Sequence, residues 1–247
     1  MLKFIKKLIK DKMSPEAYYQ YLIEENEHDK ECYYGFNEKF ANQETKLLNM
    51  YGNADEFNKS IKMILISDTH STLDEEDFKA FLARHPEYDI CLLLGDHSIY
   101  DIETIIEFVD KDKIYALLGN DDSDYIKEYN LKTLNGRTIE INGVTLLGIE
   151  GSYRYKKEDF PSFTQKESIE FLNDKPKVDI LVSHDSGFNS NMKGYPAHLG
   201  LFGITYYLFK NKVPYHIHGH LHEPFRKILK NGTQQIGVYN YEFIEFK

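Results

Sequence analysis

The sequence predicts an α/β protein with a helical extension at its N-terminus. From residue 61 onward, short apolar runs rich in β-branched residues alternate with segments of helical periodicity, which is the pattern of sheets flanked by helices. Many of these runs end in Asp, Asn or His, and four of the ten histidines fall within residues 216–222. The first 60 residues instead combine amphipathic helical segments with mixed polar and aromatic stretches.

Composition sets the limits for the class of protein. A length of 247 residues suits either one sizeable α/β domain or one domain plus an extension. The formal net charge of −10 argues against an extended nucleic-acid surface, because binding to a duplex usually requires a basic face. Cys32 and Cys91 lie far apart and form no metal or redox motif, which favours a reduced, cytoplasmic setting. No apolar run approaches the roughly 18 residues of a membrane span.

Residues 1–60 are expected to form a helical extension that carries no catalytic group. Residues 1–10 place lysines on one face of a helix and apolar side chains on the other. We expect the apolar face to pack on the domain or on a second subunit of a homo-oligomer. Contact of residues 1–12 with an anionic membrane is the less favoured alternative. A helix break is expected at residues 51–53, and the main domain follows as residues 61–247.

The main domain is predicted to contain strands buried on both faces, because its apolar runs are nearly continuous. A hairpin with an Asn-Gly turn is expected at residues 138–149. The other expected strands and helices are strands 61–67, 89–94, 113–118, 179–183, 215–218, 234–239 and 241–246, and helices 74–84, 101–110, 164–173 and one that ends near Asn211.

Polar side chains that can bind a metal follow the first three strands. Asp68 and His70 follow the first strand. Asp96 follows the second strand after a glycine, and Asn120 follows the third. Ligands of open α/β sheets bind beyond the carboxyl ends of the strands, so these side chains are expected to meet. Taken singly, each motif is more typical of a helix cap or a turn, and only their joint occurrence indicates a metal site.

Histidines near the ends of later strands are candidate nitrogen ligands. His184 ends a later strand, and His220 and His222 follow the next one. Neutral imidazole is the commonest protein ligand of borderline metals. His216 and His218 lie within that strand, and we expect them to pack or to support the ligands.

The motifs Asp-x-His, Gly-Asp, Gly-Asn-x-Asp, His and Gly-His-x-His occur in this order at successive strand ends. This pattern resembles that of the calcineurin-like metallophosphoesterase superfamily over about residues 61–247. The resemblance implies a sandwich of two mixed sheets flanked by helices, with a two-metal site at its edge. It also implies the ligands, which are Asp68, His70 and His222 for the first ion, Asn120, His184 and His220 for the second, and Asp96 for both.

Two divalent transition-metal ions are therefore the expected cofactors. The mixed His, Asp and Asn donors favour manganese, with iron, zinc, nickel and cobalt as alternatives. A hydroxide that bridges the two ions is expected to attack phosphorus. The sequence contains no motif that pairs a Ser or Cys nucleophile with a base, which agrees with this mechanism.

The sequence departs from the family pattern at Asp121. Family members usually have a histidine there that contacts substrate and helps to protonate the leaving group. A carboxylate would repel an anionic phosphate, so a diester, which carries less negative charge, is the favoured substrate. Arg154 lies in a loop with several cations that could hold a substrate phosphate or be solvated. The expected catalytic residues are Asp96, Asn120, Asp121 and, as replacements for the missing acid, His97 and His198, and the expected substrate-binding residues are Asn120 and Arg154.

The predicted function is metal-dependent hydrolysis of a small nucleotide or a similar phosphodiester. A phosphomonoesterase or protein phosphatase is the first alternative, and the missing histidine weighs against it. Net acidity and the lack of a basic, aromatic-containing stripe weigh against a nuclease. A non-catalytic scaffold with the same fold would usually have lost ligands, and none is lost here.

Overall fold

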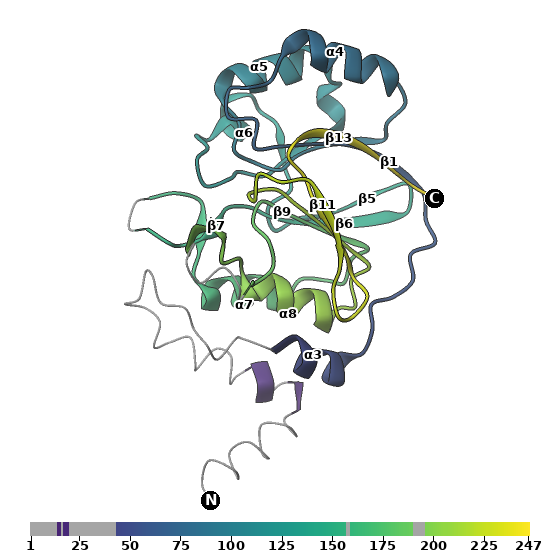
Figure 1. Ribbon diagram of the computed structural model, residues 1–247, viewed down its shortest axis with the longest axis vertical. Coiled ribbons are helices and arrows are strands. Elements are labelled where there is room, and N and C mark those ends of the chain that lie inside the picture. The colour runs from purple at the N-terminus through teal and green to yellow at the C-terminus, as the bar shows by residue number, and fades with distance from the viewer. Residues whose placement is uncertain (1–13, 16, 20–42, 157–158, 190–195) are drawn as a thin grey trace, which may run out of the picture.

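The computed structural model describes residues 14–15, 17–19, 43–156, 159–189 and 196–247. Two mixed β-sheets lie at its centre, and helices cover the outer face of each sheet (Figure 1). The predicted α/β sandwich is confirmed. The amphipathic helix expected at the start of the chain lies outside the described residues.

The first sheet has the strand order β13-β1-β2-β3-β4. Its neighbouring strands are parallel except at β13, which pairs antiparallel with β1. Parallel strands bring their carboxyl ends to one edge of the sheet, and this edge carries the candidate ligands. The strands are β1 (Ile61–Ser67), β2 (Ile90–Leu93), β3 (Ile114–Ala116), β4 (Lys132–Thr133) and β13 (Asn240–Phe246).

The second sheet has the strand order β11-β12-β10-β9-β6-β5. Its four inner strands are parallel, and the two outer strands are antiparallel to their neighbours. Asn142 and Gly143 have φ angles of 53° and 79°, the left-handed backbone that an Asn-Gly hairpin turn requires. The strands are β5 (Thr138–Ile141), β6 (Val144–Ile149), β9 (Ile180–Ser183), β10 (Tyr215–His218), β11 (Phe225–Ile228) and β12 (Gln234–Gly237).

Helices close the two outer faces. α4 and α5 lie against the first sheet, and α7 and α8 lie against the second (Figure 1). Asp74, Ser98 and Thr164 cap α4, α5 and α7, each accepting a hydrogen bond from a backbone N–H three residues on. The helices are α4 (Glu75–Arg84), α5 (Ile99–Phe108), α6 (Tyr125–Glu128), α7 (Gln165–Asn173) and α8 (Phe202–Lys210), with 3₁₀ turns η3 (Lys111–Lys113) and η5 (Pro196–His198).

The central core lies between the two sheets. Leu65 and Leu92 of the first sheet pack in one cluster with Leu146, Val182 and Ile217 of the second. All five side chains are fully buried, so both sheets contribute to the same apolar layer. Burial of such side chains stabilises the fold by about 1.5–3 kcal/mol each. This layer holds the two ligand-bearing edges side by side.

Sequence periodicity missed the short and polar strands. β4 contains two residues, and the β7 (Ser152–Tyr153) and β8 (Ser162–Phe163) pair is equally short. β11 reads Phe-Arg-Lys-Ile and is largely exposed, because it forms the outer edge of the second sheet. An edge strand does not need the apolar run by which buried strands are recognised.

The described part of the extension packs on the main domain. α3 (Gln43–Tyr51) lies against α8, and the hydroxyls of Tyr51 and Tyr206 are 3.4 Å apart. Residues 53–60 then follow the domain edge, where Lys59 Nζ lies 2.7 Å from Asp179 Oδ2. A separate extension of residues 1–60 stays a prediction. None of the described helices has the length and hydrophobicity of a membrane-spanning segment.

Phe57 offers a test of how firmly this linker is attached. Its ring makes edge contacts with Tyr215 and Phe246, at centroid distances of 5.1 and 5.5 Å. Such aromatic pairs contribute about 0.5–1.5 kcal/mol each. We therefore expect Phe57→Ala to lower the free energy of unfolding by about 1–3 kcal/mol in urea titration. The exposed neighbour provides the control, because Asn58→Ala should change it by less than about 0.5 kcal/mol. Equal values for both variants would contradict the packing.

Candidate metal centre

The candidate ligands follow strand ends of both sheets and meet where the two edges adjoin. Asp68 and Asp96 follow β1 and β2 of the first sheet, and His184 and His220 follow β9 and β10 of the second. The backbone of these turns is unusual. Residues other than glycine rarely adopt left-handed φ angles. Such angles occur here at Asp68 (53°), His70 (44°), Asp96 (59°), His220 (67°) and His222 (52°). Such strain clusters at functional sites and persists only where the surroundings enforce it.

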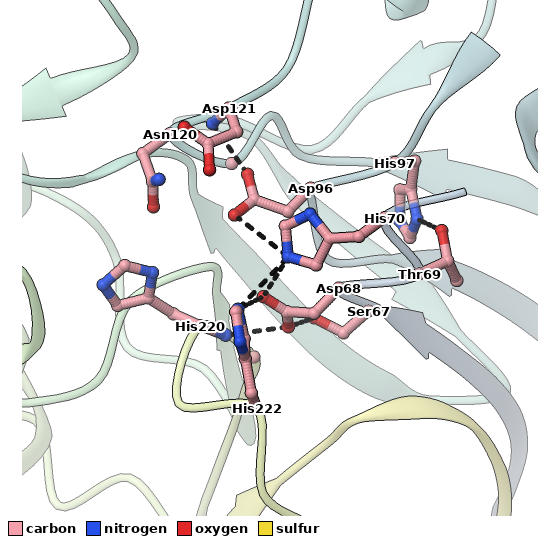
Figure 2. Close-up of polar contacts among 12 residues, drawn as sticks. Ser67, Asp68, Thr69, His70, Asp96, His97, Asn120, Asp121, His220 and His222 are labelled. Carbon is pink, nitrogen blue, oxygen red and sulfur yellow. Dashed lines mark hydrogen bonds and ion pairs between the residues drawn. The ribbon is translucent and has the colours of Figure 1, made fainter. Parts of the chain in front are cut away.

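The side chains form two groups with one shared member. Ligand atoms within each group lie within 4.8 Å of one another. Figure 2 shows the carboxylates of Asp68 and Asp96 on either side of the His70 imidazole. Asn120 adds an amide oxygen, its Oδ1 being 3.1 Å from His184 Nε2. The first group is Asp68, His70, Asp96 and His222, and the second is Asp96, His184 and His220.

Each carboxylate has one oxygen secured by the backbone and one directed into the site. Asp68 Oδ2 accepts a hydrogen bond from the His220 backbone N–H at 2.9 Å, and its Oδ1 lies 3.3 Å from His222 Nε2. Asp96 Oδ1 accepts from the Asp121 backbone N–H at 2.8 Å. Its Oδ2 lies 3.5 Å from His184 Nε2 and 4.0 Å from His70 Nε2. Asp96 Oδ2 therefore faces both groups.

Backbone carbonyls orient the two buried imidazoles. His184 Nδ1 donates to the Leu94 carbonyl at 2.8 Å, so Nε2 is the nitrogen that faces Asp96. His220 Nε2 donates to the Ala197 carbonyl at 2.7 Å. The other nitrogen, His220 Nδ1, is buried and has no hydrogen-bond partner among the described residues. A metal-binding histidine typically donates its second N–H to such a carbonyl, and a metal ion would satisfy the orphaned nitrogen. The side chains present therefore fit divalent ions.

The electrostatics of the site show a deficit of positive charge. Burial lowers the pKa of His184, but the Asp96 and Asp68 carboxylates outweigh this effect and raise it to about 10. Burial raises the pKa of Asp96, yet the neighbouring His184 brings it well below its usual range. The contact with Asp68 raises the pKa of His222. The carboxylates thus favour protonation of His184 and His222, and bound cations would take the place of these protons.

Asp122 and Gly119 hold the turns after β2 and β3 together, and neither residue was assigned a role from the sequence. Asp122 accepts three backbone N–H bonds, from Gly119 (2.6 Å), Asp96 (2.8 Å) and His97 (2.7 Å), and so fixes the turn after β3 to the turn after β2. Gly119 permits this approach, because a Cβ there would overlap Asp96 Oδ1. Asp122 ends the Gly-Asn-x-Asp motif, so the motif itself was the available signal.

The two histidines considered as acids occupy different environments. His97 is buried, its Nδ1 lies 2.9 Å from Thr69 Oγ1, and Figure 2 shows it on the side of the cluster away from Asn120 and His220. Burial lowers the pKa of His97 to about 4. His198 is half-buried in η5, and its ring centroid lies 5.0 Å from that of His220. Only His198 of this pair borders the second group.

Other predicted residues lie outside the cluster. Arg154 contacts Glu167 at 2.9 Å and donates to Ser162, so it would have to break an ion pair before it could bind a phosphate. His216 and His218 are buried, and they form hydrogen bonds with Ser183 and Gln235, respectively, which agrees with a packing role. Asp121 is exposed beside Asn120, and the structure brings its backbone rather than its carboxylate to Asp96.

Solved structures share this fold at low sequence identity. Protein TT1561 of Thermus thermophilus has a TM-score of 0.51 and 12% identity, over 76% of this chain and 98% of that one. The phosphopantetheinyl hydrolase PptH of Mycobacterium tuberculosis has a TM-score of 0.50 and 14% identity, over 72% of this chain and 89% of that one. A 5′-nucleotidase of Candida albicans has a TM-score of 0.51 and 12% identity, over 77% of this chain but 48% of that one. At these identities the likeness shows the fold alone.

Sequence comparison identifies the family. No curated protein sequence matches this chain. Residues 61–224, however, match the family model described as calcineurin-like phosphoesterase. This segment begins with β1 and includes every residue of the two ligand groups. The chain therefore belongs to the calcineurin-like phosphoesterase family.

Proposed function

We propose that this chain is a two-metal phosphoester hydrolase that prefers diesters to monoesters. The observation that carries the proposal is the position of Asp96 Oδ2, which faces His70 of one group and His184 of the other. A carboxylate oxygen in that place can be shared by two cations. Asp68, His70 and His222 would hold one ion, Asn120, His184 and His220 the other, and Asp96 both.

The residues would act mainly by orientation. When bound, the two divalent ions supply the positive charge that activates a water nucleophile and stabilises the phosphoryl oxygens. The chain fixes the donors beforehand, through the Asp121 N–H on Asp96 and the Leu94 and Ala197 carbonyls on the imidazoles. Fixed donors need no rearrangement during the reaction. The mixture of imidazole, carboxylate and amide favours manganese, with iron, zinc, nickel and cobalt as alternatives.

The diester preference rests on the charges around the second group. Asp121 adds an exposed carboxylate beside Asn120. A phosphomonoester dianion would be repelled more strongly than a diester monoanion. His198 is the half-buried imidazole that borders His220, and no hydrogen bond engages its ring among the described residues. We propose that His198, rather than the buried His97, contacts the leaving group. Three expectations stay predictions: that the substrate is a small nucleotide diester, that the protein is cytoplasmic and that it forms a homo-oligomer.

The first test compares bis-p-nitrophenyl phosphate with p-nitrophenyl phosphate as substrates. The full chain loaded with manganese should cleave the diester faster, and chelation should abolish both activities. Asp96→Ala serves as the inactive variant. We expect it to lose more than about 100-fold in kcat/KM, since loss even of a group that only orients a ligand costs about 10–100-fold. Activity that survives both chelation and Asp96→Ala would rule out the two-metal mechanism.

A second test concerns the charge at position 121. Asp121→His should raise the ratio of monoester to diester turnover by about 10-fold or more, because it removes a repelling charge and adds a proton donor. Asp121→Asn is the matched control, since it removes the charge without supplying an acid. A rise with His alone identifies proton donation, and an equal rise with both identifies repulsion. An unchanged ratio in both variants would contradict any role of Asp121 in substrate choice.

A third test separates His198 from the other histidines. A poor leaving group needs a proton more than p-nitrophenolate does. His198→Gln should therefore slow cleavage of a phenyl diester by about 100-fold and of the p-nitrophenyl diester by much less. His85 stacks on Phe243 outside the site, so His85→Gln is the control and should leave both rates near wild type. Equal slowing of both substrates by His198→Gln would argue against contact with the leaving group.

A further inference from the structure

A single carboxylate in α5 accepts several hydrogen bonds from the turn after β1, which carries Asp68 and His70. Asp101 is 3% exposed. Its Oδ2 accepts hydrogen bonds from the Ser71 N–H at 2.7 Å and from Thr69 Oγ1 at 2.8 Å, and its Oδ1 accepts from the Leu73 N–H at 3.2 Å. These three donors belong to the segment that directly follows Asp68. Asp101 is not a member of either ligand group.

The turn held by Asp101 has a backbone that needs support. Asp68, His70 and Ser71 have φ angles of 53°, 44° and 65°. Left-handed backbone is unfavourable for residues with a side chain, and three such residues within four positions do not form without external contacts. Backbone carbonyls of the β2 turn accept the N–H groups of Asp68 (Gly95, 2.9 Å) and His70 (Asp96, 3.3 Å). One side chain, Asp101, holds the rest of the turn, since the Ser71 N–H and the Thr69 hydroxyl both donate to its Oδ2.

The same carboxylate belongs to the second ligand turn. Asp101 is the third residue of α5 and completes a capping box, in which it accepts from the Ser98 N–H and donates its own N–H to Ser98 Oγ. Ser98 lies two residues after Asp96. Asp101 therefore fixes the turn of Asp68 and His70 to the turn that presents Asp96.

His97 adds a parallel link between the two turns. The Thr69 hydroxyl donates to Asp101, so its oxygen is free to accept from the His97 Nδ1–H at 2.9 Å. Figure 2 shows this pair beside the cluster and outside it. These two hydrogen bonds connect His97 in the turn after β2 to Thr69 in the turn after β1, and Thr69 to Asp101 in α5. A supporting role in this path accounts for the burial of His97.

We propose that Asp101 is the positioning residue of the first ion site. Its carboxylate sets the separation between Asp68 and His70 on one turn and Asp96 on the other, and thereby the affinity for one of the two ions. The inference rests on the proposed metal centre. Contacts that orient metal ligands typically change metal affinity by about 10–100-fold when they are removed.

The experiment measures manganese binding to the full chain by titration calorimetry. Asp101→Asn keeps the shape of the side chain and weakens its capacity to accept hydrogen bonds. We expect one of two binding steps to weaken by about 10–100-fold while the other stays within about 3-fold of wild type. A general loss of folding would weaken both steps together, so unequal loss is the signature of positioning.

Asp74→Asn is the matched control. Asp74 caps α4 by accepting the Asp77 N–H, as Asp101 caps α5, but it does not bond to a ligand turn. It should lower the melting temperature of the metal-free protein less than Asp101→Asn does, because Asp74 is exposed and its side chain accepts one capping hydrogen bond, and it should leave both binding steps unchanged. Thr69→Val provides a second variant, which removes the hydroxyl link alone and should weaken the same step as Asp101→Asn by a smaller factor.

The outcomes separate this inference from the proposed function. Two wild-type binding steps in Asp101→Asn would overturn the positioning role and leave the metal centre intact. Equal weakening of both steps, or the same weakening in Asp74→Asn, would also overturn it. A wild-type chain that binds no manganese, iron, zinc, nickel or cobalt would instead overturn the proposed function. If Asp101→Asn does not fold, Thr69→Val decides the matter, and wild-type binding in that variant counts against the proposal.

Discussion

The site depends on the shared apolar layer that holds the carboxyl ends of two parallel arrays of strands side by side. Leu65 and Leu92 pack in one cluster with Val182 and Ile217, and the polar residues that follow these strands form two groups, with ligand atoms within 4.8 Å of one another in each group. Asp96 lies at this seam, with its backbone held by Asp122 and its side chain between histidines from both sheets. Neither sheet alone supplies enough donors for two ions.

This arrangement costs stability. Left-handed backbone at Asp68 and Asp96 is unfavourable in the metal-free chain, as is a buried His220 nitrogen that has no hydrogen-bond partner in the described part of the chain. The surrounding contacts offset these costs by giving each turn several hydrogen bonds to one carboxylate, Asp122 in one case and Asp101 in the other. Positively charged ions would then remove the remaining electrostatic conflict, so ligand geometry and metal binding support each other.

The two candidate acids show how burial decides chemistry for the same residue type. His97 and His198 both lie next to ligand motifs in the sequence or the fold, yet one bonds to Thr69 inside the protein and the other borders His220 at the surface of the cluster. A substrate can reach only a group that solvent can reach. Arg154 is a similar case, because its ion pair with Glu167 competes with any bound anion.

The long buried strands of the main domain, the helices that flank them and the order of the ligands could be predicted from local sequence. Continuous apolar runs such as residues 61–67 encode buried strands locally, and a polar residue directly after such a run must lie at the sheet edge. The contact partners of individual residues could not be predicted in this way. The roles of Asp101 and Asp122, the burial of His97 and the edge strand β11 depend on packing between segments distant in the chain. Local periodicity carries no information about such contacts, because the same residue types serve equally well in caps and turns.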